Sequence, residues 1–111
     1  FPVRAFSTCK HLSAVSFPEG LQTIENLAFE GTGIIELTLP KSVMNVGTWA
    51  FRDNKALRTV QILGIAKSGY GVFYNCTNLQ TVQIEGTLSE LPNTMFVDCK
   101  QLKNVTRVVR L

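Results

Sequence analysis

One pattern of apolar and polar positions recurs along almost the whole chain. Its clearest copy is Leu79-Gln-Thr-Val-Gln-Ile, or L-x-x-V-x-I. Alternation of apolar and polar residues is typical of a β-strand with one buried face, so the pattern predicts one short strand per repeat. The three apolar slots hold, in turn, Leu12, Ile34, Leu57, Leu79 and Leu102; Val15, Leu37, Val60, Val82 and Val105; and Phe17, Leu39, Ile62 and Ile84.

A phenylalanine marks the period of the repeat. Phe6, Phe29, Phe51, Phe73 and Phe96 follow one another at spacings of 23, 22, 22 and 23 residues. A fixed period of this length indicates a solenoid, in which each coil buries its apolar side chains against its neighbours. We therefore expect these five rings to stack in a single buried column.

A further apolar slot lies between each strand and the next phenylalanine. The sequence predicts only loops and turns on this side of the coil. The slot holds Leu21, Val43, Ile65, Leu88 and Leu111, and its companion three residues later holds Ile24, Val46, Ser68 and Leu91.

The three cysteines occupy a turn position of the repeat. Cys9, Asn54, Cys76 and Cys99 each stand three residues after a phenylalanine. Asn and Cys side chains in such a turn can hydrogen-bond to the adjacent backbone. No Cys-x-x-Cys spacing is present, and the one histidine, His11, has no carboxylate placed beside it by the repeat. We predict structural, reduced thiols with no disulfide, and no catalytic residue, metal site or cofactor.

The segments GLQTIENLAF (20–29) and VFYNCTNL (72–79) resemble the BspA-like leucine-rich repeats of bacterial and protist surface proteins. The resemblance implies a leucine-rich-repeat solenoid, with a parallel β-sheet of one short strand per coil of 22–23 residues. We expect residues 1–111 to form one array of about five coils within a longer protein. The resemblance also implies a non-enzymatic protein-binding or adhesion module, extracellular or at the cell surface.

Composition narrows the range of partners. Hydrophobic residues make up 45% of the chain and charged residues 17%, which is enough apolar surface for a packed core. The net charge of +3 is too small to indicate a nucleic-acid partner. No apolar run approaches the roughly 18 residues that span a bilayer, so we expect no membrane insertion.

The polar residues between the apolar slots should point away from the core, because successive side chains on a strand alternate. We expect this strand face to serve as a hydrogen-bonding platform for a protein partner, extracellular or on a host surface. Two alternatives stay open: a structural spacer that displays other domains, and a glycan-binding module built on Trp49, Tyr70 and Tyr74. The candidate binding residues are Thr38, Arg58, Thr59, Gln61, Thr81, Gln83, Asn104 and Thr106.

Overall fold

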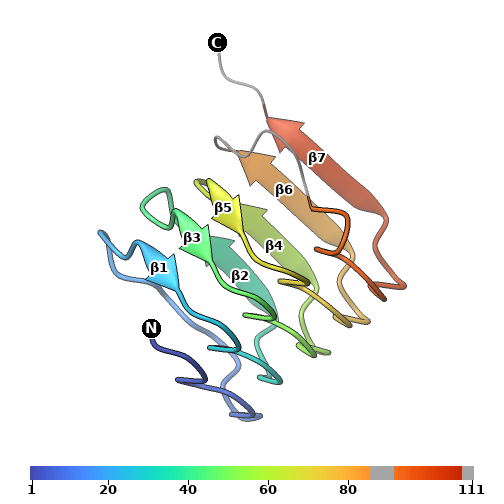
Figure 1. Ribbon diagram of the computed structural model, residues 1–111. Helices are drawn as coiled ribbons and strands as arrows, with labels where there is room; N and C mark the ends of the chain where they lie inside the picture. Colours follow the sequence, from blue (N-terminus) through green and yellow to red (C-terminus); the bar gives the residue numbers. More distant parts are fainter. Residues whose placement is uncertain (86–91, 109–111) are drawn as a thin grey trace.

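The computed structural model describes residues 1–85 and 92–108, which form a parallel β-solenoid with no helix among them (Figure 1). Its larger sheet has the strand order β2-β4-β6-β7. Each strand carries one copy of the repeated pattern, and all pairings are parallel and in register with the repeat. The predicted leucine-rich-repeat solenoid is therefore confirmed. The strands are β2 (Glu36–Leu39), β4 (Thr59–Ile62), β6 (Thr81–Glu85) and β7 (Asn104–Val108).

A second parallel sheet occupies the side where only loops and turns were predicted. It consists of β1 (Thr23–Ile24), β3 (Asn45–Val46) and β5 (Lys67–Ser68), in the order β1-β3-β5. That prediction is wrong because two residues per coil are too few to show an alternating pattern. Stacking at the period of the repeat nevertheless aligns Ile24 with Val46, and Val46 with Ser68. Leu88, Leu91 and Leu111 lie outside the described residues.

The phenylalanine column is present as predicted. Adjacent rings from Phe6 to Phe96 stack with centroids 5.2, 5.3, 5.6 and 5.9 Å apart and with interplanar angles below 20°. Phe29, Phe51 and Phe73 are completely buried, whereas the outermost rings, Phe6 and Phe96, are half-buried. Burial is complete only where a coil lies on both sides, as expected for a solenoid.

The first copy of the pattern is an exception, because residues 13–17 form no strand. Phe17 fills the slot that the smaller aliphatic residues Leu39, Ile62 and Ile84 hold in the next three coils. Its ring packs edge-on against Phe1 and Phe29, at 5.8 and 5.6 Å. This bulk accompanies a separation of the segment from β2. Among the described residues, the one backbone hydrogen bond between them is donated by the N–H of Ile35, just before β2, to the Ser13 carbonyl at 3.3 Å. The prediction of a strand in every repeat is wrong here.

Left-handed backbone flanks the phenylalanines on both sides. Residues two before and two after the ring have φ between 55° and 66° in coil after coil, and only two of these positions are glycine. Such values are uncommon for residues with a side chain, so the turn conformation is held by its surroundings. The residues are Arg4, Thr8, Leu27, Gly31, Trp49, Asp53, Gly71, Asn75 and Asp98.

Candidate functional site

The larger sheet turns ordered columns of polar side chains outward. The pairing register places Glu36, Thr59, Thr81 and Asn104 in one column. A second column, two residues along each strand, contains Thr38, Gln61, Gln83 and Thr106. Within β2 and β4 these residues are exposed while their neighbours are buried, so the predicted alternation is confirmed.

Arg58 belongs to a third column, just before the strands begin. Its N–H donates to the Ile35 carbonyl at 2.8 Å, and its carbonyl accepts from the Gln80 N–H at 2.9 Å. The structure thus brings seven of the eight candidate residues into the two columns of one face and places Arg58 at their margin. Glu36 was left out of the predicted set, although the repeat places it in the same column as Thr59 and Thr81.

The centre of this face is hollowed. A shallow pocket of about 330 Å³ lies over the middle strands, lined by both columns and by the backbone between them. Across it the Gln61 Nε2 donates to the Gln83 Oε1 at 3.5 Å, a long hydrogen bond. Both amides keep free donor and acceptor capacity. The face can therefore offer hydrogen bonds to a partner from a backbone fixed by sheet pairing.

Hydrogen bonds from side chains to backbone carbonyls form a ladder along the turns. The Asn54 amide is completely buried and donates to the carbonyls of Phe29 and Phe51, at 2.9 and 2.6 Å. The Cys76 thiol donates to the Phe51 carbonyl at 3.2 Å, and the Cys99 thiol to the Phe73 carbonyl at 3.1 Å. This confirms the predicted structural role, in which each side chain binds the coil before it.

All three cysteines are free thiols, as predicted. Hydrogen bonding between Cys76 and Cys99 raises the pKa of Cys76 well above its usual value, and burial adds to this increase. The same hydrogen bond lowers the pKa of Cys99. Cys9, in the first coil, is exposed.

A buried carboxylate also joins three coils at the turns. Glu30 accepts hydrogen bonds from Arg52 and from the Ser7 hydroxyl, the latter at 2.9 Å, and lies 3.4 Å from Arg4. Burial by itself raises the pKa of Glu30, but the hydrogen bonds from Arg52 and Ser7 outweigh it and hold the pKa below its usual value. The sequence signal was available, since Ser7, Glu30 and Arg52 each follow a phenylalanine directly.

Two of the aromatic residues considered for glycan binding, Trp49 and Tyr70, contact other side chains. The guanidinium of Arg52 lies 4.5 Å from the centre of the Trp49 ring, and Tyr70 packs edge-on against that ring at 6.0 Å. Trp49 and Tyr74 are half-buried, while Tyr70 is exposed. Trp49 therefore packs within the turn, where Arg52 covers one face of its ring.

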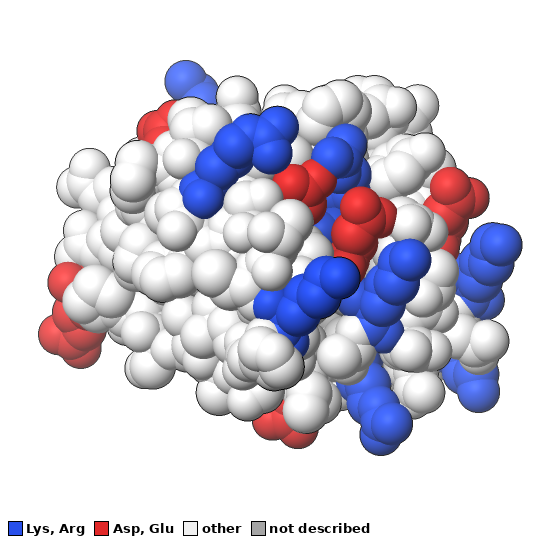
Figure 2. Space-filling model, turned by 90° about the horizontal axis from the view of Figure 1, so that it is seen from below, with Lys and Arg blue, Asp and Glu red and all other residues white. Residues whose placement is uncertain are grey.

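Figure 2 shows the face of the molecule seen from below the view of Figure 1. Lys and Arg side chains are interspersed there with Asp and Glu, so this face is not uniformly basic. Within residues 1–85 and 92–108, no group of three His, Cys, Asp or Glu residues is placed to hold a metal ion. The same residues contain no helix of the length and apolarity that crossing a membrane requires.

The parallel sheet, the phenylalanine column and the Asn/Cys turn ladder define a leucine-rich-repeat protein. Comparison with protein families identifies the particular type: the BspA type leucine rich repeat region matches residues 2–106 in six copies. The chain belongs to this family. A comparison with curated protein sequences finds no match.

Two solved structures share the fold. A leucine-rich repeat protein from Bacteroides ovatus has 25% sequence identity and a TM-score of 0.74, over 84% of this chain and 24% of that one. A leucine rich cell surface protein from Faecalibacterium prausnitzii has 21% identity and a TM-score of 0.60, over 85% of this chain and 31% of that one. The chain thus spans about a quarter to a third of these proteins.

Proposed function

We propose that this repeat array is a non-enzymatic protein-binding or adhesion module of a cell-surface or secreted protein, and that it contacts its partner through the strand face. The observation that carries the proposal is the pair of polar columns across the larger sheet, with the hollow of about 330 Å³ between them. A surface location is supported by the Faecalibacterium protein, which is described as a cell surface protein.

The geometry of the face suits a partner surface better than a small molecule. The hollow is shallow, and its polar lining consists of Thr and Gln side chains and Glu36 on paired strands, whose backbone is already ordered. Ordered groups lose little entropy on binding, so each new hydrogen bond contributes more to affinity. Arg58 at the margin adds one charge, which can orient a partner.

The first test removes the two central amides together. We expect Gln61→Ala with Gln83→Ala to leave folding nearly unchanged, because neither side chain belongs to the core, and to weaken binding by about 1 to 3 kcal/mol. Binding is measured by interferometry against a panel of purified extracellular-matrix and host-surface proteins. Circular dichroism and thermal unfolding verify the fold.

The controls are Gln22→Ala and Lys67→Ala, which change exposed residues before β1 and within β5, at the second sheet. Both should keep full affinity. Equal affinity of the double variant and the parent chain for every bound protein would rule out the strand face, and would favour the spacer or attachment through the turns.

A further inference from the structure

The larger sheet ends in an incompletely paired edge. Among the described residues β2 has a strand partner on one side only, β4. On its other side lie residues 13–17, which carry the strand pattern but form no strand. In the described part of the chain, these residues are joined to β2 by the single backbone hydrogen bond from Ile35 to Ser13.

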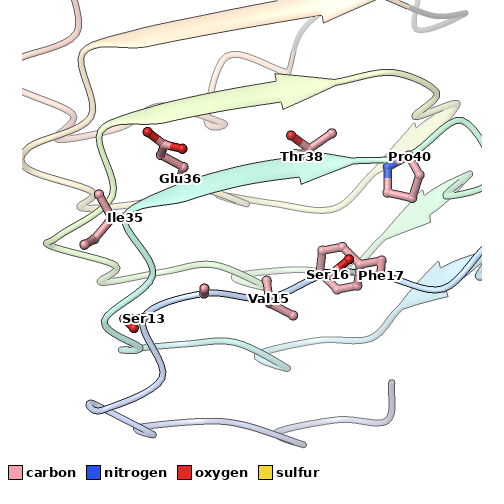
Figure 3. Close-up of a pocket in the computed structure, with 9 residues that line it drawn as sticks. Ser13, Val15, Ser16, Phe17, Ile35, Glu36, Thr38 and Pro40 are labelled. Carbon is pink, nitrogen blue, oxygen red and sulfur yellow. The ribbon is translucent and has the colours of Figure 1, made fainter.

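A groove of about 640 Å³ opens where the two segments part (Figure 3). Val15, Ser16 and Phe17 line it from the first coil. Ile35, Glu36 and Thr38 line it from β2 and the residue before. Its volume is within the range of pockets that bind small ligands or a few residues of peptide. The groove is therefore bounded by an edge strand on one side and by half-buried apolar side chains on the other.

We propose that this groove binds an extended peptide segment of a partner protein, which adds to the edge of β2 as a further strand. An edge strand presents backbone N–H and C=O groups that a partner strand can satisfy, and this mode of peptide recognition is common. The first-coil segment leaves that role largely unfilled. Residues 36–39 are long enough to pair with about four residues of peptide.

The walls of the groove specify which side chains the peptide should carry. Glu36 is the only charged residue in its lining, so a Lys or Arg on the peptide would be complementary to it. Ile35 is 45% exposed and, with half-buried Val15 and Phe17, offers apolar contact. Since side chains alternate along a strand, we infer a peptide in which basic and apolar residues alternate.

This inference rests on the proposed function for its assumption of a protein partner. Glu36 and Thr38 line both the groove and the strand-face hollow, but the deciding contact here is the open edge of β2. Its central residues are Glu36 and the edge of β2, whereas the strand-face proposal depends on Gln61 and Gln83. The double change of Gln61 and Gln83 to Ala should therefore leave peptide binding intact. The two proposals can fail separately.

The test uses three fluorescent seven-residue probes and fluorescence anisotropy on the whole chain. One probe alternates Val with Lys, one alternates Val with Glu, and the third is the Val–Lys probe with its alternate backbone amides methylated. We expect the Val–Lys probe to bind about tenfold more tightly than either of the others, because each lacks the charge or the backbone donors.

Variants of the carboxylate complete the design. Glu36→Gln should remove the preference for the basic probe, and Glu36→Lys should reverse it. The matched control is Glu25→Gln, an exposed carboxylate outside the groove, which should bind like the parent chain. Circular dichroism verifies that each variant folds.

Three results would overturn the proposal. The first is equal binding of the methylated and unmethylated basic probes, and the second is an unchanged preference in Glu36→Gln. The third is an amide hydrogen-exchange result for the free chain. It would show every backbone amide of residues 36–39 to be as protected as the amides of β4, which is paired on both sides. That result would mean that the first coil closes onto β2 and leaves no site.

Discussion

At the scale of single residues, Asn54 is a buried polar side chain whose hydrogen bonds join two coils. It is a polar side chain with no exposed surface, and its amide serves carbonyl groups from two successive coils. Thr32 donates its hydroxyl to the same side chain. Buried polar groups cost stability when they lose their partners, so this residue should tolerate little change.

We expect Asn54→Ala to lower the free energy of unfolding by about 2 to 3 kcal/mol, since the Phe29 carbonyl loses its side-chain donor and the Thr32 hydroxyl loses its acceptor. Asn54→Cys should cost clearly less, because Cys76 and Cys99 make the equivalent bond to the preceding coil. Urea unfolding followed by circular dichroism measures both. Equal losses for the two variants would contradict the hydrogen-bonding role.

At the scale of elements, the phenylalanine column joins coils that are otherwise linked through their sheets. Phe51 is completely buried between the rings of Phe29 and Phe73. Truncation to Ala should cost about 3 to 5 kcal/mol, as for other buried phenylalanines. Phe96→Ala should cost less, because that ring is half-buried. Thermal and urea unfolding of the two variants provide the comparison.

Some of these elements could be predicted from the sequence and others could not. The larger sheet was predictable because three apolar slots per repeat define both the strand and its buried face. The outward columns followed from the same alternation. The second sheet was not predictable, since β1, β3 and β5 have two residues each. Nor was the open edge at β2, which depends on how Phe1 and Phe17 pack together in the first coil.

At the scale of the whole molecule, the Glu30 cluster makes stability depend on pH. The pKa of Glu30 is lower in the folded protein than its ordinary value. Its contribution is therefore fully present above the pKa of the unfolded chain, and is lost as the pH falls through the folded pKa. Below about pH 5 the parent chain should lose stability more steeply than Glu30→Gln, which has no carboxylate to protonate.

Urea unfolding midpoints over a series of acidic pH values measure this difference. Glu25→Gln is the matched control, since it makes the same chemical change at an exposed residue. Its pH dependence should follow that of the parent chain. Parallel curves for Glu30→Gln and the parent would show that the cluster across Arg4, Ser7 and Arg52 does not couple stability to protonation.

The left-handed residues beside each phenylalanine bear on how the array assembles. Seven of them are not glycine, and Arg4, Thr8, Leu27 and Trp49 are residue types that rarely adopt this backbone, so a coil alone has little tendency to make its own turns. The backbone hydrogen bonds from Phe29 to Ala50 and from Phe51 to Val72 hold each turn to the next. Each coil therefore takes its shape from a finished neighbour, which acts as a template. Growth from a nucleus of adjacent coils follows, and an isolated coil should stay unstructured.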